Sequence, residues 1–149
     1  MENSKKVHFI GIGGIGISAI ARFLNEKGFK ISGSDIKESP TTKELAAQGI
    51  EVITPHSKEA IKDQDFVVYS AAIKSDNIEL VAAREKGITC LSRKEALPAV
   101  LEGKKVFAVA GAHGKSTTSA MLSSLVEGSV IIGAISKQFG SNMKYQAHE

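Results

Sequence analysis

The chain has 149 residues, of which 42% are hydrophobic and 23% charged, and its formal net charge is +3. This composition is typical of a soluble globular protein with a buried core. Lysine and arginine are mixed with aspartate and glutamate and form no basic run, so the charge pattern argues against a nucleic-acid partner. No stretch is long and apolar enough for a membrane-spanning helix, so we expect no membrane partner.

The single cysteine, Cys90, excludes an internal disulfide and a cysteine metal cluster within this sequence, which suits the reducing cytoplasm. We therefore expect a cytoplasmic location. A secretory signal is the alternative, because Lys5 and Lys6 precede the apolar stretch "VHFIGIGGIGISAIA". Five of those fifteen residues are Gly or His, which suit a turn better than a continuous apolar helix.

Short β-rich runs alternate with helical patterns as far as Leu101. Strands are predicted at residues 6–10, 30–34, 51–53, 65–73 and 88–91, and the fourth is apolar throughout, which favours an interior position. Helices are predicted after the first, second and fourth strands and again before Gly103; their markers are Ile17, Ile20, Ala21 and Leu24, then Pro40, then Ile78, Val81 and Ala82, and finally Leu97, Val100 and Leu101. This alternation predicts an α/β fold, a Rossmann-like parallel sheet with helices on both faces.

A second strand–loop–helix–strand unit begins near Lys105. A strand is predicted at residues 105–110, a helix with Met121, Leu122 and Leu125 on its apolar face, and a strand at residues 130–135. No element is predicted after Ser136. We expect residues 1–103 to form a complete first domain and residues 104–149 to begin a second. Apolar residues of that second part, such as Val130, Ile132 and Ile135, should then be incompletely covered and partly disordered.

The first motif, "GIGGIG" at residues 11–16, lies between a predicted strand and a predicted helix, as the dinucleotide-binding fingerprint requires. Gly11 allows the tight turn, Gly13 lets backbone N–H groups approach a diphosphate, and Gly16 allows helix and strand to pack closely. The helix N-terminus adds partial positive charge. Asp35 ends the second strand, where an acid commonly accepts from ribose hydroxyls. We interpret the turn as a nucleotide-diphosphate site; a glycine turn packed for structural reasons is the alternative.

The second motif, "GAHGKST" at residues 111–117, has the parts of a phosphate loop at a shorter spacing than G-x-x-x-x-G-K-[ST]. With a predicted strand before it and a helix after it, its backbone N–H groups can hold phosphates. Lys115 can neutralise β- and γ-phosphate charge, and the Ser116 hydroxyl can bind Mg²⁺. We interpret the loop as a site for ATP and Mg²⁺; a glycine turn with an incidental lysine is the alternative.

The stretches "HFIGIGGIGISAIA", "ISGSD", "YSAAI" and "AVAGAHGKSTTSAM" occur in this order and together resemble the Mur ligases of bacterial peptidoglycan synthesis. In that family the first domain holds a UDP-sugar and the second begins with the ATP loop. The resemblance is greatest with the member that joins L-alanine to UDP-N-acetylmuramate, through an acyl phosphate formed with ATP. The member that reattaches recycled murein tripeptide is the nearest alternative.

The resemblance also implies a role for individual residues. The ATP-binding residues would be Gly111, Ala112, His113, Gly114, Lys115, Ser116 and Thr117, with Lys115 and Ser116 catalytic and Ser116 on the metal. The UDP-sugar-binding residues would be Gly11, Gly13, Gly14, Ile15, Gly16, Asp35, His56, Ser70 and Ala71. Two positions depart from the family, since Ala112 and Ser116 both stand where threonine is usual. Because the family has three domains, we expect this chain to be a fragment that is inactive by itself, of unknown oligomeric state.

Other polar residues have simpler interpretations. His8 alternates with apolar neighbours and is expected to be a structural histidine, and Cys90 a small buried apolar residue. For Arg93 a sugar contact and a surface position are equally open. Two further classes of function also stay open: an NAD-dependent oxidoreductase, which leaves the second loop without a task, and a non-catalytic nucleotide sensor.

Overall fold

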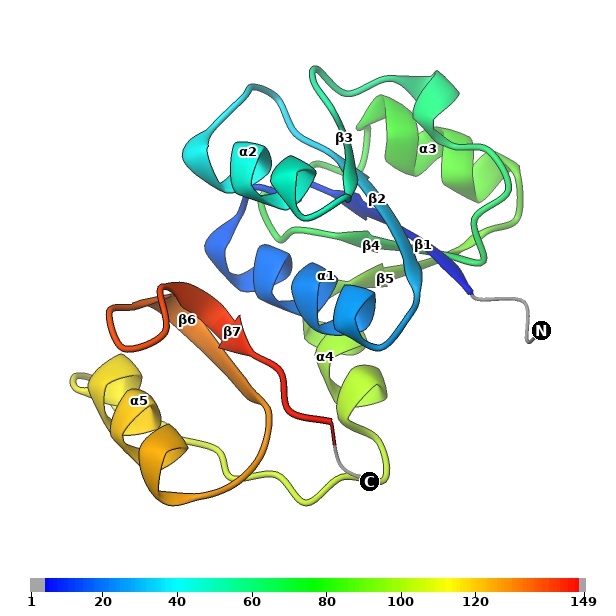
Figure 1. Ribbon diagram of the computed structural model, residues 1–149. Helices are drawn as coiled ribbons and strands as arrows, with labels where there is room; N and C mark the ends of the chain where they lie inside the picture. The colour runs from blue at the N-terminus through cyan, green and yellow to red at the C-terminus, as the bar shows by residue number, and fades with distance from the viewer. Residues whose placement is uncertain (1–4, 148–149) are drawn as a thin grey trace.

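The computed structural model describes residues 5–147, and its larger part is a five-stranded sheet (Figure 1). The strands are β1 (Lys6–Ile10), β2 (Lys30–Ser34), β3 (Glu51–Ile53), β4 (Phe66–Tyr69) and β5 (Thr89–Ser92). They lie in the order β3-β2-β1-β4-β5, and every neighbouring pair is parallel. This is the strand order of a Rossmann-like sheet, with β1 at the centre and the reversal of strand order beside it. The predicted fold class is confirmed.

Helices cover both faces of this sheet. The four helices are α1 (Ile15–Glu26), α2 (Pro40–Ala47), α3 (Ile78–Glu85) and α4 (Arg93–Leu101), and a short 3₁₀ helix spans Lys58–Ala60. On one face α1 packs at the centre, with α2 and α4 beside it, while α3 and the 3₁₀ helix lie on the other face (Figure 1). Parallel strands joined through helices require this two-faced cover, because both faces of the sheet are apolar.

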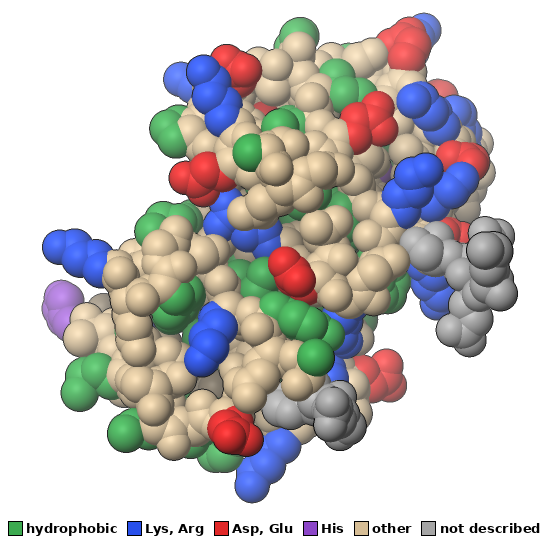
Figure 2. Space-filling model, in the orientation of Figure 1, with side chains coloured by type: hydrophobic (Ala, Val, Ile, Leu, Met, Phe, Trp, Pro, Cys, Tyr) green, Lys and Arg blue, Asp and Glu red, His purple; other side chains and the backbone are tan. Residues whose placement is uncertain are grey.

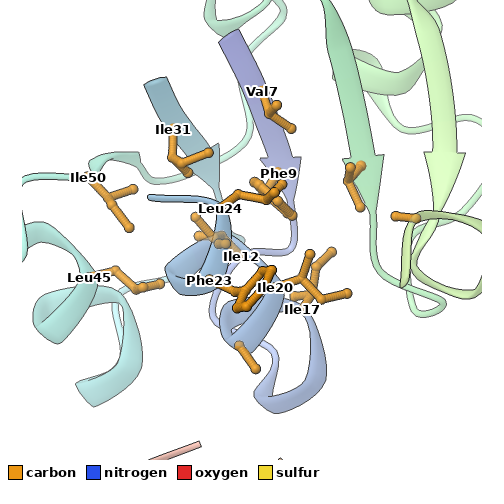
Figure 3. Packing of buried hydrophobic residues seen from close by; sticks show 14 of the residues in the cluster. Val7, Phe9, Ile12, Ile17, Ile20, Phe23, Leu24, Ile31, Leu45 and Ile50 are labelled. Carbon is orange, nitrogen blue, oxygen red and sulfur yellow. The ribbon is translucent and has the colours of Figure 1, made fainter. Parts of the chain in front are cut away.

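The core on the α1 face is formed by β1, β2 and α1 (Figure 3). Phe9, Ile12 and Ile20 are fully buried there, and Leu45 of α2 reaches the same cluster. A second cluster on the α3 face joins Ile10 and Val67 to Leu80. The helix α1 is therefore held firmly against the sheet, and its N-terminus is fixed beside the carboxyl ends of β1 and β2.

One local prediction within the sheet is corrected. The strand expected at residues 65–73 ends at Tyr69, because the chain then turns, with the N–H of Ile73 donating to the carbonyl of Ser70 at 3.0 Å. The helix α3 forms where the markers Ile78, Val81 and Ala82 predicted one, but Ile78 and Val81 are exposed. Ile78 is 52% exposed, whereas the neighbouring Glu79 is fully buried. Polar groups at the sheet edge hold that carboxylate, so the buried face of α3 includes an acidic side chain.

The strand predicted at residues 105–110 is wrong. No helix or strand occupies residues 104–114, and Phe107 is 62% exposed. A β-strand needs a hydrogen-bonded neighbour, and no strand within residues 5–147 lies beside this segment. The apolar run is present, but the partner that would make it a strand is not in the described part of the chain.

The C-terminal part contains α5 (Lys115–Leu125), β6 (Val130–Ser136) and β7 (Ser141–Lys144). The strand β7 was not predicted; it pairs antiparallel with β6 in a hairpin, with Ile131 opposite Met143. The hairpin packs on α1, on the side away from the sheet, and α5 packs against β6 (Figure 1). Ile132 is buried, contrary to expectation, while Ile135 is 49% exposed as incomplete cover predicts.

Surface properties agree with the composition. On the face shown in Figure 2, acidic and basic side chains intermingle. Among residues 5–147, none of the helices combines the length and the apolar character needed to cross a bilayer.

Candidate functional site

The glycine turn at residues 11–16 leads from β1 into α1. Gly11 has a φ of +78°, a conformation that favours glycine, and the N–H groups of Gly11 and Ile12 both donate to the carbonyl of Ser34, at 2.8 and 2.9 Å. The N–H of Gly14 donates to the carbonyl of Gly11 at 3.1 Å, and Gly14 is the N-cap of α1. The turn is thus fixed by backbone bonds to the carboxyl end of β2.

Asp35, which directly follows β2, is hydrogen-bonded to this turn. One carboxylate oxygen accepts the N–H of Gly13 at 2.8 Å, and the other accepts the N–H of Ile36 at 2.8 Å. The sequence predicted Asp35 as an acceptor for ribose hydroxyls; its geometry adds a second task, which is to hold the glycine turn. A carboxylate has about four lone-pair sites, so capacity for a ligand remains.

Other elements approach two of the glycines closely. A Cβ on Gly13 would lie 2.8 Å from the Asp35 carboxylate and 3.1 Å from Cγ2 of Thr42, at the start of α2. A Cβ on Gly16 would lie 2.6 Å from Cζ of Arg93. The turn is therefore bordered by the N-terminus of α2 on one side and by an exposed guanidinium on the other.

Arg93 belongs beside the site, and a local signal places it there. It is the first residue of α4, whose start is fixed by a capping box: Ser92 accepts the N–H of Glu95, and the Glu95 carboxylate accepts the N–H of Ser92 at 2.8 Å. Hydrogen bonds from the Ser92 side chain and backbone hold the pKa of the Glu95 carboxyl below its usual range. The spacing S-x-x-E in "SRKE" is the sequence signature of this cap.

Ser70 also borders the turn. Its N–H donates to the carbonyl of Ile10 at 3.0 Å, and a Cβ on Gly11 would lie 3.1 Å from its Cβ. Ala71 follows it in an exposed turn. Ile15, the first residue of α1, is 40% exposed. The residues predicted to bind a UDP-sugar from β1, β2, β4 and α1 thus gather at one edge of the sheet.

His56, also predicted as a ligand contact, lies on the α3 side of that edge. Its Nδ1 is 2.8 Å from the hydroxyl of Ser34 and 3.5 Å from the carboxylate of Glu79. Its Nε2 is buried and has no hydrogen-bond partner among the described residues. A buried ring nitrogen without a partner is unfavourable, so this atom is a candidate for a ligand contact.

Glu79 is a buried carboxylate that sequence analysis missed. It accepts the N–H of Ser57 at 2.8 Å and the hydroxyl of Ser34, and lies 3.4 Å from Nε2 of His8. Burial by itself would raise the pKa of this carboxyl, but hydrogen bonds from His8, Ser34 and Ser57 outweigh burial and lower it. His8 is buried and bonded to Ser32 as well, at 2.9 Å, which agrees with a structural histidine.

The second motif forms a loop around its own lysine. Gly114, with a φ of +76°, is the N-cap of α5, and Nζ of Lys115 donates to the carbonyls of Gly111 and Ala112 at 2.6 and 3.0 Å. The loop and the first turn of the helix are exposed, including His113, Ser116 and Thr117. The N–H groups of a first helical turn have no intrahelical acceptor. The loop can therefore present N–H donors, an ammonium and hydroxyls to one anion.

The two loops belong to different parts of the fold. The glycine turn lies at the edge of the sheet and is bordered by α2 and α4, whereas the second loop precedes α5 and is exposed. No cluster of three or more His, Cys, Asp or Glu side chains suited to a metal occurs in residues 5–147.

Comparisons with known proteins agree with this arrangement. The chain is 85% identical to the UDP-N-acetylmuramate–L-alanine ligase of Campylobacter curvus over 141 residues, which are 95% of this chain and 32% of that protein. The structure of UDP-N-acetylmuramate-alanine ligase from Thermotoga maritima matches with a TM-score of 0.87 at 35% identity, covering 94% of this chain and 34% of that one. A UDP-N-acetylmuramate:L-alanyl-gamma-D-glutamyl-meso-diaminopimelate ligase from Neisseria meningitides matches with a TM-score of 0.85 at 30% identity, covering 94% and 46%.

The chain spans about a third of the length of the curated relatives that it matches. Residues 6–105 match the family described as "Mur ligase family, catalytic domain". That match covers the whole sheet, from β1 to β5, together with the glycine turn and Arg93. The chain belongs to the Mur ligase family.

Proposed function

We propose that this chain supplies the UDP-sugar-binding part and the ATP loop of a ligase that joins L-alanine to UDP-N-acetylmuramate in peptidoglycan precursor synthesis. The observation that carries the proposal is the 85% identity to the Campylobacter curvus ligase over 95% of the chain, a span that includes both glycine motifs. Residues 1–103 would bind the UDP-sugar, and residues 104–149 would begin the ATP-binding part.

The glycine turn has the chemistry that a diphosphate needs. Gly11, Gly13 and Gly14 shape the turn, and the first-turn N–H groups of Ile15 and Gly16 have no intrahelical acceptor. Negative charge there is favoured by the helix dipole. The Arg93 guanidinium, packed against Gly16, adds a full positive charge that can bind phosphate in a bidentate manner.

Four more residues would contact the rest of the UDP-sugar. Ser70 and Ala71 follow β4 at the same edge, and the Ser70 side chain lies within contact distance of the turn. The buried Nε2 of His56 lacks a partner among the described residues, and a ligand oxygen or N–H would satisfy it. Asp35 would act twice, by holding Gly13 and by accepting from the nucleoside.

The second loop suits the phosphates of ATP. Lys115 lies against the loop carbonyls, so its ammonium is held where a β- or γ-phosphate would lie over the N-terminus of α5. Mg²⁺ takes one or two protein oxygens together with phosphate oxygens and waters. The hydroxyl of Ser116, in the first turn of α5, fits that demand. When bound, the ion would neutralise charge on the phosphates.

The chemistry explains why a ligase needs both sites. A free carboxylate resists attack by an amine, because oxide would have to leave. In the proposed reaction the lactyl carboxylate oxygen attacks the γ-phosphorus of ATP and ADP leaves; the neutral amine of L-alanine then attacks the acyl carbon, phosphate leaves and nitrogen loses a proton. Lys115 would stabilise charge on the phosphoryl group during the first step.

The tripeptide ligase of the same family is the rival proposal. The Neisseria tripeptide ligase shares the fold of this chain at 30% identity, well below the 85% of the L-alanine ligase. The names of both ligases include UDP-N-acetylmuramate, so the first site would bind the same molecule in either case. The identity difference favours L-alanine as the amine.

Calorimetry tests the first site directly. UDP-N-acetylmuramate should bind the chain, and NADH should bind far more weakly; tight NADH binding without a UDP-sugar signal would instead support an oxidoreductase. Adenylyl imidodiphosphate with Mg²⁺ should bind at the second loop. Because the relatives are about three times as long, we expect no alanine-dependent phosphate release from the chain by itself, and robust release would overturn that part of the proposal.

A further inference from the structure

The side chain of Asn142 is fully buried between the C-terminal hairpin and helix α1. Its Nδ2 donates to the carbonyl of Ile15 at 2.6 Å and to the hydroxyl of Ser18 at 2.8 Å. Its Oδ1 accepts from the guanidinium of Arg22 at 2.9 Å. Every polar atom of this amide therefore has a partner on α1, although the two elements are more than a hundred residues apart in the chain.

Arg22 extends the same contact. Its guanidinium, 3% exposed, also donates to the hydroxyl of Ser141 at 3.0 Å and to the carboxylate of Glu44 at 2.8 Å. Apolar side chains complete the interface, with Met143 buried and Tyr145 edge-on to Phe23 at 5.7 Å. Apolar contacts tolerate small shifts, whereas a satisfied buried polar group fixes one arrangement. The polar contacts thus set the register of the hairpin on the helix.

Each side of this interface leads to one of the two loops. Ile15 is the first residue of α1 and directly follows the glycine turn. On the other side, β6 packs against α5, and α5 begins at the second loop. In Figure 1 the hairpin lies between α1 and α5. The hydrogen bond from Asn142 to Ile15 therefore connects the segment that carries the second loop to the residue that directly follows the two central glycines of the glycine turn.

We propose that Asn142 is a positioning residue that fixes the second loop, at residues 111–117, relative to the glycine turn at residues 11–16, and that it thereby couples the occupancy of the two loops. The coupling half of the proposal rests on the proposed function, because it requires a UDP-sugar at one loop and ATP at the other. The positioning of the second loop relative to the glycine turn does not rest on the proposed function. Because Asn142 is fully buried, it would act through its contacts with α1 and not by touching either ligand.

Asn142→Asp tests the hydrogen bond to Ile15 separately from the hydrogen bond with Arg22 that keeps the hairpin on α1. The aspartate has the same shape and keeps an acceptor for Arg22, so the hairpin stays attached to the helix. It places an oxygen against the Ile15 carbonyl in place of a donor, so the hold on the first turn is lost. Gln146→Ala is the matched control, because it removes a side-chain hydrogen bond at the base of the hairpin, which Gln146 accepts from the N–H of Gly128 at 2.9 Å.

The placement is measured by the distance between two spin labels, at Lys37→Cys beside the glycine turn and Ser124→Cys on α5, in a Cys90→Ser background. Both label sites are exposed. The parent and the Gln146→Ala control should give one narrow distance distribution, and Asn142→Asp a broader or shifted one. A distribution for Asn142→Asp as narrow as the parent's, and at the same distance, overturns the proposal. If Asn142→Asp does not fold, Ser18→Ala removes one of the two acceptors of the amide and should broaden the distribution in the same direction.

The coupling is measured by titrating UDP-N-acetylmuramate with and without saturating adenylyl imidodiphosphate and Mg²⁺. In the parent the second ligand should change the UDP-sugar dissociation constant by roughly fivefold or more, the lower end of measured couplings. In Asn142→Asp the two constants should be equal. Equal constants in the parent overturn the coupling. A parent that binds neither nucleotide refutes the proposed function instead, and the label distances still decide the role of Asn142.

Discussion

The carboxylate of Asp35 accepts the N–H of Gly13 at 2.8 Å, so the acid that ends β2 is built into the turn that ends β1. A hydrogen bond to a charged group contributes about 1.5–3 kcal/mol. Asp35→Ala should therefore weaken the binding of UDP-N-acetylmuramate by roughly ten- to a hundredfold. Calorimetry measures the loss.

Asp35→Asn distinguishes holding the turn from contacting the ligand. The asparagine keeps one acceptor oxygen for Gly13, so the turn should survive with a smaller loss of affinity. Equal affinity of Asp35→Ala and the parent would show that the turn holds its shape without the acid, and that Asp35 does not contact the nucleoside.

Gly16→Ala tests whether Arg93 binds the ligand. The added Cβ would lie 2.6 Å from Cζ of Arg93, at the end of a flexible side chain that can move aside. The fold should be retained, while UDP-sugar affinity falls because the guanidinium has left the turn. Arg93→Ala should produce a similar loss, and the double variant little more than either single one, which is the signature of a shared interaction. Additive losses would contradict a common cause.

Gly33→Ala is the matched control for that experiment. Its Cβ would lie 2.7 Å from the backbone carbonyl of Phe9, which cannot move aside. This variant should lose thermal stability, as overpacking of a core by about 1–3 kcal/mol predicts, whereas Gly16→Ala should not.

Glu79 makes stability depend on acid pH. Because the folded pKa of this carboxyl is lowered, the unfolded state binds more protons in the acid range. The stabilisation is fully present above the ordinary glutamate pKa of about 4.3 and is lost as pH falls below it through the folded value. Urea unfolding between pH 3 and 7 should show a steeper acid decline for the parent than for Glu79→Gln. Parallel curves would mean that another carboxyl governs the decline.

The sequence predicted the central sheet well because its signals are local. The ranges of β1, β2 and β3 are as predicted, since each strand is a short apolar or mixed run that follows or precedes a glycine or proline signal. The first glycine motif lies between a strand and a helix as predicted, and the second lies at the start of a helix. Their roles toward nucleotides stay predictions.

The failures have tertiary causes. The apolar run at residues 105–110 forms no strand, because a strand is defined by its neighbour and none lies beside it in residues 5–147. The strand β7 was missed because its sequence, "SNMK", shows little apolar character; its burial depends on Asn142 finding partners on α1. Glu79 was missed because its hydrogen-bond partners lie on β1, on β2 and in the segment after β3, all far from it in the sequence.

Lys115→Ala tests the second loop. The ammonium contacts the carbonyls of Gly111 and Ala112, and it is the charge that would meet the phosphates of ATP. Loss of this charged donor should weaken the binding of adenylyl imidodiphosphate by about tenfold or more. Lys104→Ala, which removes an exposed lysine outside the loop, is the control. Unchanged affinity of Lys115→Ala would place the nucleotide elsewhere.

Hydrogen exchange should divide the C-terminal part of the chain into two classes. Residues 104–114 contain no helix or strand, so their amides should exchange at nearly the rate of an unfolded peptide. The hairpin should behave differently, because β6 and β7 pair with each other and Ile132 and Met143 are buried against α5 and α1. Amides such as that of Met143 should therefore be protected nearly as well as those of β1.

Asn142→Leu should increase exchange in β7 while leaving β1 unchanged, since it removes the polar contacts to α1 and leaves the sheet intact. Fast exchange throughout the hairpin of the parent would show that its packing on α1 is only transient in solution, and the placement of the second loop would then need another cause.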